Sequence, residues 1–460
     1  MISQTLLKEF KEKAGQENVF TDKADLVTYS YDAAVLEPVL PGVAIRPTNS
    51  EALSHIVRLC NENKIPLTVR GAGTNLSGGT IPLPQGVVVL TNALTKILEI
   101  NEADMYAVVQ PGVVTAKLAA AVSAKGLFYP PDPGSQAVST LGGNVAENAG
   151  GLRGLKYGVT RDYVMGIQFF DVNGEIVKTG SRTVKCATGY NLTGLLVGSE
   201  GTLGVFNEIT LKLIPLPAHQ KAMVAVFDNI DKASETVAAI IANRIVPATL
   251  EFMDNFTIRA VEDYSHVGLP TDAAALLLIE VDGYPAQVEE DAEKVESLCR
   301  QKGATSIRVA KDAAERDSVW AARRSALSAL AKLKPTLVLE DATVPRSKIP
   351  DMVRAMQDIA KEYRISIGTF GHAGDGNLHP TILTDRRDKE EWARVEAAIA
   401  AIFDKALGMG GTLSGEHGTG LAKSCFLEKE TSAATIIYSR KIKTALDPNY
   451  ILNPGKIIGQ

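Results

Sequence analysis

Residues 130 to 151 read PPDPGSQAVSTLGGNVAENAGG, a stretch in which pairs of glycines alternate with short polar side chains. A glycine lets the backbone N–H approach a ligand without a Cβ in the way. Similar composition recurs in RGAGTNLSGG (70–79) and VGSEGTLGV (197–205), and YGVTRDYV (157–164) lies between them in the chain. So much open, polar backbone predicts loops that surround a ligand. The loop at 70–79, which comes first in the chain and is called the first loop, suits a pyrophosphate.

The spacing of the first loop excludes two familiar nucleotide-binding patterns. It has neither the GxGxxG of a dinucleotide fold nor the GK[ST] ending of a Walker loop. Taken alone, the loop is equally typical of a structural glycine turn. The combination of several such loops is what favours a ligand.

The pattern of glycine, apolar and polar residues changes twice along the sequence, which predicts three sections. Residues 1–215 are expected to form a mixed α+β domain, 216–410 a domain with an antiparallel sheet backed by helices, and 411–460 a segment of glycine loops that packs back on the first domain. We expect the active site where the two domains meet. The predicted strands are Leu67–Arg70, Val87–Leu90, Tyr106–Gln110, Gly166–Val172, Ile209–Ile214, Ala222–Phe227, Ala274–Val281 and Ser366–Phe370. Helices are predicted from Ser50 and over Val114–Ala124, Asp231–Asn243 and Gln287–Lys302, with a hairpin turn at Asn173-Gly174.

Composition narrows the class of protein. The formal net charge is −5 and the Lys and Arg residues are dispersed, so nothing predicts a nucleic-acid partner. No apolar run approaches the roughly 18 residues of a spanning helix, and the N-terminus has no secretory pattern. We therefore expect a cytoplasmic protein without a transmembrane segment. Its four dispersed cysteines predict reduced thiols and no iron–sulfur ligand run.

A metal site is predicted from two segments far apart in the chain. GHAGDGNLHP (371–380) contains His372 and His379 after a predicted strand, and SGEHGTG (414–420) adds Glu416 and His417. The histidine pair alone is equally consistent with ordinary loop histidines. Two histidines and one carboxylate form a common divalent-metal site with open positions, so the combination favours a metal.

In order and spacing, these loops resemble the FAD domain of the vanillyl-alcohol oxidase and p-cresol methylhydroxylase superfamily. The closer resemblance is to its FAD-linked D-2-hydroxy-acid dehydrogenase family, of the D-lactate dehydrogenase and glycolate oxidase type. The resemblance implies an α+β fold with a two-part FAD-binding domain, and a cap domain with an antiparallel sheet. It also implies non-covalent FAD, since Asn75 and Leu76 stand where several relatives attach FAD through a histidine.

The resemblance maps FAD contacts onto the glycine loops and their neighbours. The implied cofactor-binding residues are Val69, Arg70, Gly71, Ala72, Gly73, Thr74, Asn75, Leu76, Gly78, Gly79, Pro131, Asp132, Ser135, Thr140, Leu141, Gly142, Gly143, Asn144, Ala146, Asn148, Gly150, Gly151, Gly158, Val159, Gly201, Val205 and Asn453.

The resemblance also assigns chemical roles. It places zinc, manganese or iron on His372, His379 and Glu416 and makes His417 the general base, with the hydride passing to flavin N5. The stretch DSVWAARRSAL (317–327) resembles the family's W-x-x-R segment, so Arg323 would bind the substrate carboxylate while Arg324, about 100° away on a helix, would be solvated. Asn377 would orient the substrate or a metal ligand, although a turn-forming asparagine explains it equally well.

The predicted reaction is the oxidation of a short D-2-hydroxy acid to the 2-oxo acid, with D-lactate favoured and glycolate next. Leu327 and Leu339 stand where the D-2-hydroxyglutarate branch has a hydroxyl residue and a lysine for the distal carboxylate. D-2-hydroxyglutarate remains the alternative substrate, with Arg346 or Lys348 as the groups that would reach that carboxylate. A metallohydrolase and a flavin subunit that only relays electrons are alternatives of other classes.

The electrons need an acceptor outside the chain, because the sequence has no nicotinamide fingerprint and no iron–sulfur ligands. Relatives use quinones, cytochromes, iron–sulfur subunits or electron-transferring flavoprotein. The sequence is compatible with a homodimer and with a hetero-oligomer.

Overall fold

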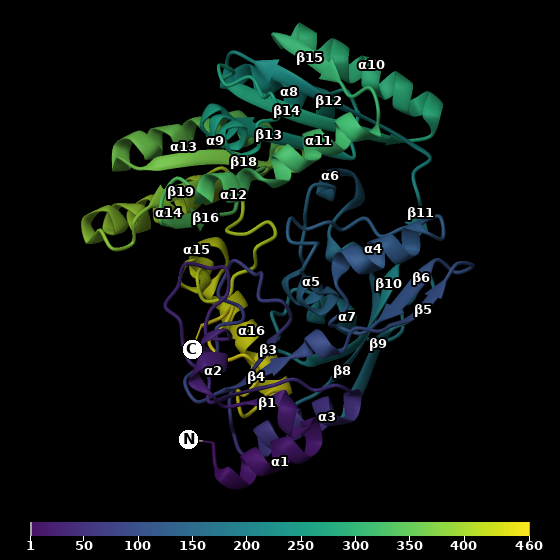
Figure 1. The fold of residues 1–460 in the computed structure, drawn as a ribbon, viewed down its shortest axis with the longest axis vertical. Coiled ribbons are helices and arrows are strands. Elements are labelled where there is room, and N and C mark those ends of the chain that lie inside the picture. Colours follow the sequence, from purple (N-terminus) through teal and green to yellow (C-terminus); the bar gives the residue numbers. More distant parts are fainter. Residues whose placement is uncertain (1, 460) are drawn as a thin grey trace. The chain divides into compact units, whose positions relative to one another are not determined.

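The computed structural model describes residues 2–459. The chain forms two compact units (Figure 1). The first consists of Met1–Gly150, Val159–Leu216 and Glu416–Gln460, and the second of Gly151–Gly158 and Pro217–Gly415. Gly151, the last residue of the glycine stretch 130–151, therefore belongs to the second unit. We call the second unit the cap unit and the first the loop unit.

The loop unit contains a four-stranded sheet in the order β1-β2-β4-β3 and a five-stranded antiparallel sheet in the order β5-β6-β10-β8-β9. In the smaller sheet β4 runs parallel to both β2 and β3. The strands of the loop unit are β1 (Val19–Phe20), β2 (Val43–Ile45), β3 (Leu67–Arg70), β4 (Val87–Leu90), β5 (Ile97–Asn101), β6 (Tyr106–Val109), β7 (Leu127–Phe128), β8 (Val164–Phe170), β9 (Ile176–Gly180), β10 (Val205–Lys212) and β11 (Ile214–Pro215). Its helices are α1 (Gln4–Ala14), α2 (Lys23–Val27), α3 (Ser50–Glu62), α4 (Thr115–Ser123), α5 (Leu141–Glu147), α7 (Leu192–Leu196), α15 (Leu427–Glu430) and α16 (Ala433–Leu446).

Local sequence explains these elements. Strand β4 is the run VVVL, buried along its whole length, as expected of a strand paired in parallel on both sides. The predicted turn at Asn173-Gly174 is confirmed between β8 and β9, where Gly174 has a φ of 76° and Asp171 Oδ1 accepts hydrogen bonds from the N–H groups of Asn173 and Glu175 at 2.9 Å each.

The C-terminal segment adds backbone pairing to the loop unit. The N–H of Leu67 in β3 donates to the carbonyl of Ile451 at 2.7 Å, and the N–H of Asn453 donates back to the carbonyl of Leu67 at 2.7 Å. The expectation of glycine loops throughout this segment is wrong beyond about residue 420, because α16 follows. Lys443 is the one buried residue of that helix, so the helix lacks the apolar stripe that would have predicted it.

The cap unit is built on an antiparallel eight-stranded sheet. Its order is β15-β12-β14-β13-β18-β19-β16, with β17 paired to β19. Its strands are β12 (His219–Phe227), β13 (Thr249–Asp254), β14 (Ala275–Gly283), β15 (Ser306–Val309), β16 (Thr336–Leu339), β17 (Ala342–Thr343), β18 (Ser366–His372) and β19 (Asn377–Thr384). Its helices are α6 (Gly154–Tyr157), α8 (Ile230–Ala242), α9 (Asn255–Ser265), α10 (Pro285–Gln301), α11 (Ala313–Arg324), α12 (Ala326–Ala331), α13 (Ile349–Tyr363) and α14 (Lys389–Gly408).

Two groups of helices pack on this sheet. α8, α10, α13 and α14 contact one another and the strands, and α9, α11 and α12 form a second group. The second group shares an apolar core with the sheet, in which Met253 of β13 and Phe370 of β18 pack against Trp320 of α11. The mixture of a partly parallel sheet with antiparallel sheets and packed helices confirms the α+β expectation.

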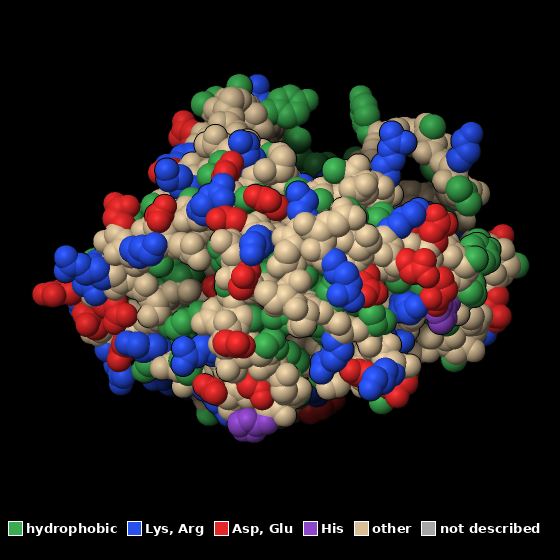
Figure 2. All heavy atoms as spheres, turned by 90° about the horizontal axis from the view of Figure 1, so that it is seen from above, with side chains coloured by type: hydrophobic (Ala, Val, Ile, Leu, Met, Phe, Trp, Pro, Cys, Tyr) green, Lys and Arg blue, Asp and Glu red, His purple; other side chains and the backbone are tan. Residues whose placement is uncertain are grey.

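On the face drawn in Figure 2, basic and acidic side chains are interspersed. Among residues 2–459, none of the helices combines the length and the apolar character needed to cross a bilayer.

The buried pair Lys443 and Asp447 anchors the C-terminal segment and yields a stability prediction. Asp447 is fully buried, binds the Lys443 ammonium at 2.5 Å and accepts the N–H groups of Ile451 and Leu452. Asp447→Ala leaves that ammonium buried without its carboxylate, so we expect the free energy of unfolding to fall by about 3–5 kcal/mol in urea titrations. Removing the exposed partner in Glu290→Ala should leave the free energy of unfolding nearly unchanged, because that pair is hydrated and screened. Equal losses in the two variants would contradict this assignment.

Candidate active site

The two histidines of the predicted metal site lie on one β-hairpin. His372 is the last residue of β18, which runs two residues beyond the predicted end at Phe370, and His379 lies inside the next strand, β19, which was not predicted. The strands pair Phe370 with His379 and His372 with Asn377. The two imidazole rings consequently lie 5.0 Å apart, centroid to centroid, and are nearly perpendicular.

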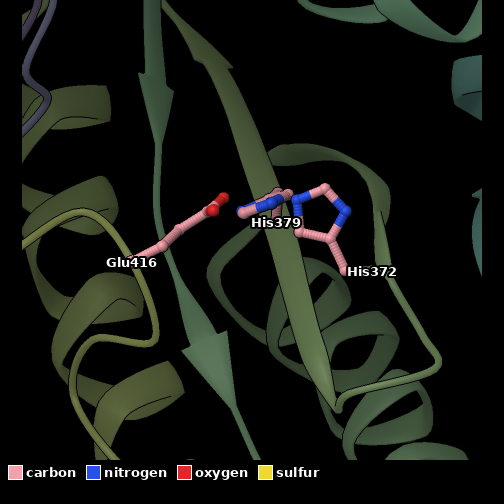
Figure 3. Close-up of side chains that lie close together, drawn as sticks. All are labelled: His372, His379 and Glu416. Carbon is pink, nitrogen blue, oxygen red and sulfur yellow. The ribbon is translucent and has the colours of Figure 1, made fainter. Parts of the chain in front are cut away.

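Glu416 completes the set. Its neighbour Gly415 packs against the side chains of Thr343 and Asn377, where a Cβ would collide, and Ser414 Oγ donates to Asp341 Oδ2 at 2.8 Å. One ligand atom each from His372, His379 and Glu416 lie within 4.8 Å of one another, and Figure 3 shows the three side chains converging.

A buried carboxylate absent from the sequence-based prediction supports this group. Glu251 of β13 has no exposed surface. Its Oε1 binds Nδ1 of His372 at 2.7 Å, and its Oε2 accepts from Nε and Nη2 of Arg323 at 2.7 and 2.5 Å. Burial alone would raise the pKa of Glu251, but the charges and hydrogen bonds of His372 and Arg323 outweigh burial and lower it. The signal in the sequence is a charged residue inside the apolar run TLEFMD, which requires a partner when buried.

The donor chemistry of the group fits a divalent metal. Because Nδ1 of His372 is engaged by Glu251, Nε2 is the nitrogen left for a metal, and Figure 3 shows that nitrogen directed toward His379 and Glu416. A metal-binding histidine whose other nitrogen contacts a carboxylate is a recurrent arrangement. Two imidazoles and a carboxylate accept zinc, manganese or iron.

The two neighbouring arginines of α11 differ in burial. Arg323 is 6% exposed and its guanidinium lies 4.7 Å from the centroid of the Phe370 ring, whereas Arg324 is exposed. Nη1 of Arg323 takes no part in the bonds to Glu251. Asn377 is buried at the start of β19, where its Oδ1 accepts from Thr343 Oγ1 at 3.1 Å.

His417 lies in the loop unit, in a segment held by a second buried carboxylate. Glu200 accepts the N–H groups of Thr419 and Gly420 at 2.7 and 2.8 Å. Burial raises the pKa of Glu200 to about 7, although these donors and nearby lysines lower it. Gly418 has a φ of 82°, and a side chain there would collide with Glu147 and Glu200. The backbone around the buried His417 is thus tightly constrained.

The first glycine loop has the backbone that a phosphate needs. Within residues 2–459, no protein acceptor binds the backbone N–H groups of residues 72 to 76. Gly73 and Gly78 adopt φ values of 71° and 80°, which favour glycine. Successive N–H groups of this kind form concave anion sites, so the loop fits the diphosphate of a dinucleotide such as FAD.

Several polar side chains of the predicted cofactor set hold the loops to one another. Asn453 Nδ2 donates to the carbonyls of Gly79 and Glu200 at 2.8 and 2.7 Å and so ties the first loop to the third. Asn144 Nδ2 donates to Thr115 Oγ1 at 2.8 Å. Others in this role are Arg70, bound to Tyr31 and Thr80, Asn75, bound to Asp32, Thr140, which caps α5, and Asn148, which accepts from Arg161.

Comparison with known proteins identifies the family. A model described as an FAD binding domain matches residues 41–180, and one described as the C-terminal domain of FAD linked oxidases matches residues 216–457. The glycolate oxidase subunit GlcD of Bacillus subtilis is 51% identical over 460 residues, which cover 100% of this chain and 98% of that protein. A D-lactate dehydrogenase of Anaerostipes hadrus is 34% identical, covering 99% of this chain and 98% of its own length.

Solved structures agree on the fold. The structure of p-cresol methylhydroxylase with substrate bound superposes with a TM-score of 0.83 at 18% identity, covering 100% of this chain and 98% of the other. The 4-ethylphenol oxidase of Gulosibacter chungangensis gives a TM-score of 0.80 at 20% identity, covering 98% and 96% of the two chains.

The fold and the matched domains define an FAD-linked oxidoreductase. The chain belongs to the FAD-linked oxidase family that includes the glycolate oxidase protein GlcD and D-lactate dehydrogenase, and it shares the fold of p-cresol methylhydroxylase. The predicted family, fold class and FAD cofactor are therefore confirmed.

Gly150 offers a test of how Glu416 is placed. A Cβ on Gly150 would lie 2.6 Å from Oε2 and 3.1 Å from the Cβ of Glu416. Gly150→Ala should therefore displace the Glu416 carboxylate and weaken zinc or manganese binding by about tenfold or more, measured by chelator competition. Gly134→Ala, in the same glycine stretch, meets nothing within 4 Å and is the control. Unchanged metal affinity in Gly150→Ala would show that Glu416 is not a ligand.

Proposed function

We propose that this chain oxidises a short D-2-hydroxy acid to the corresponding 2-oxo acid, using FAD and a divalent metal, with D-lactate favoured and glycolate next. The observation that carries the proposal is a buried guanidinium, Arg323, tied through Glu251 to a histidine of the His372, His379 and Glu416 group. A 2-hydroxy acid has a carboxylate for a guanidinium and a hydroxyl for a metal. The names of the relatives, a glycolate oxidase subunit and a D-lactate dehydrogenase, support the same substrate class.

The residues of the chain bind the substrate and move its hydroxyl proton. Arg323 offers Nη1 to the substrate carboxylate, since Nε and Nη2 are engaged by Glu251. His417 accepts the hydroxyl proton, because an imidazole can take up a proton near neutral pH. Asn377, fixed by Thr343, orients the substrate. When bound, the metal stabilises negative charge on the hydroxyl oxygen and FAD accepts the hydride.

The preference for a short acid rests on the apolar residues near Arg323. Leu327 and Leu339 are half-buried and pack against the same core as Trp320 and Phe370. A second carboxylate placed among these side chains would lose hydration without gaining a cation. This favours D-lactate and glycolate over D-2-hydroxyglutarate.

The electrons then pass to a partner, either electron-transferring flavoprotein, an iron–sulfur subunit or a diffusible carrier. The word "subunit" in the name of the 51% identical relative supports an assembly with another chain.

Anaerobic mixing with D-lactate tests the reaction. The visible absorbance of bound FAD should disappear in the untreated protein. His379→Ala and chelator-treated protein should retain FAD but be reduced at least about 100-fold more slowly, because the hydroxyl loses its Lewis acid. A protein that carries FAD and metal yet stays yellow with both D-lactate and glycolate would refute the proposal. Equally fast bleaching after metal removal would refute the role of the metal.

Substrate length gives an independent prediction. The ratio kcat/KM for D-2-hydroxyglutarate should be at least about 100-fold below that for D-lactate, as expected when a charged group is left without a partner. Leu339→Lys should narrow this difference, because the ammonium would supply the missing partner for the second carboxylate. A D-2-hydroxyglutarate activity equal to or above that with D-lactate would reverse the assignment.

A further inference from the structure

Glu251 contacts both a candidate metal ligand and the candidate substrate-binding arginine. It lies on β13, His372 ends the neighbouring strand β18, and Arg323 comes from α11. Each of its carboxylate oxygens has its own partner, Oε1 at His372 and Oε2 at Arg323. The neighbouring strand register pairs Phe252 with Gly371, which places Glu251 beside His372 on one face of the sheet.

We propose that Glu251 is a positioning residue that sets the metal-binding tautomer of His372 and the orientation of Arg323 at the same time. The part that concerns Arg323 rests on the proposed function, whereas the part that concerns His372 requires only that the group binds a metal. In this role Glu251 acts through His372 and Arg323 and does not itself touch the substrate.

The effect on His372 follows from acceptor chemistry. A carboxylate only accepts hydrogen bonds, so the Nδ1 that contacts Glu251 carries the proton. The lone pair of the ring is then on Nε2, the nitrogen directed toward His379 and Glu416. A carboxylate in this position also raises the basicity of the ligating nitrogen, and its loss typically weakens metal binding by about 10–100-fold.

The effect on Arg323 is geometric. The hydrogen bond from Nε and the ion-pair contact of Nη2 converge on one oxygen of Glu251 and hold the guanidinium, and the Phe370 ring lies against it. Nη1 is left as the donor that can meet a substrate. One carboxylate thus fixes both groups that a 2-hydroxy acid would contact.

Glutamine at position 251 separates this role from simple packing. Its size matches glutamate, but it has one acceptor oxygen and one NH₂ group. If the oxygen serves Arg323, the NH₂ faces His372 and forces the ring proton onto Nε2, which blocks the metal-binding nitrogen. If the oxygen serves His372, Arg323 faces a donor and loses its fixed orientation.

Glu280 provides the matched control. It is a second buried carboxylate in the cap sheet, on β14, and it accepts from Trp320 Nε1 of the same helix α11 at 2.8 Å. Glu280→Gln therefore perturbs the packing of α11 on the sheet without touching His372 or Arg323. Glu251→Asp retains the charge but is shorter, so it should keep only part of the effect.

The experiment measures zinc affinity by chelator competition in FAD-loaded, metal-depleted protein, with thermal unfolding recorded for each variant. We expect Glu251→Gln to bind zinc about 10–100-fold more weakly, Glu251→Asp to fall between it and the native protein, and Glu280→Gln to stay within about threefold. ¹⁵N spectra of histidine-labelled, metal-free protein should show the His372 ring protonated on Nδ1 in the native chain and on Nε2 in Glu251→Gln.

Native-like zinc affinity in Glu251→Gln, or an equal loss in Glu280→Gln, would overturn the inference. If Glu251→Gln is too unstable to study, a native-like affinity in Glu251→Asp would overturn it instead. Because affinity and tautomer are measured without turnover, a protein that fails to oxidise D-lactate would refute the proposed function and leave this test intact. With an active enzyme, Glu251→Gln should also raise KM for D-lactate.

Discussion

A buried carboxylate on the cap sheet is the constraint on which the candidate site depends. An ionised Glu251 without solvent contact is tolerated only if both oxygens meet strong donors. An imidazole on the next strand and a guanidinium from the covering helix satisfy this requirement. Meeting it fixes the side chains of β18 and α11 relative to one another before any ligand binds. The relative placement of His372 and Arg323 in the cap unit therefore follows from neutralising one buried charge.

In the loop unit, side chains hold the glycine loops together and backbone N–H groups are left for a ligand. Their asparagine side chains are used to tie loop to loop, as Asn453 does between the first and third loops. The N–H groups of residues 72 to 76 lack protein acceptors in the described chain, and these residues are exposed or half-buried, so a ligand can reach them. A ligand that supplies those acceptors binds the folded chain better than the unfolded one and so stabilises it. The loop unit is thus expected to be completed energetically by its cofactor.

Sequence alone predicted those features that local pattern or chemistry determines. The strand Leu67–Arg70 and the turn at Asn173-Gly174 follow from β-branched runs and glycine. His372, His379 and Glu416, which the structure brings together, were selected because few residue types bind transition metals. Strand β19 was not predicted, because Pro380 and the glycines before it are typical of a loop, although Pro380 lies within β19. The partners of Glu251 could not be found, because they lie 72 and 121 residues away in the chain.

The register of the cap sheet explains why the partners of Glu251 cannot be read from the sequence, although the fold holds them in place. A shift of β13 by one residue would turn Glu251 to the other face and replace it with Leu250 or Phe252. Gly371 opposes Phe252 in that register, and a Cβ on it would lie 2.5 Å from the carbonyl oxygen of Asn377, so β18 and β19 can approach only with glycine there. One glycine thus permits the hairpin that carries both histidines and aligns it with the strand that carries their carboxylate. Pairing across strands, which no local pattern encodes, places Glu251 beside His372.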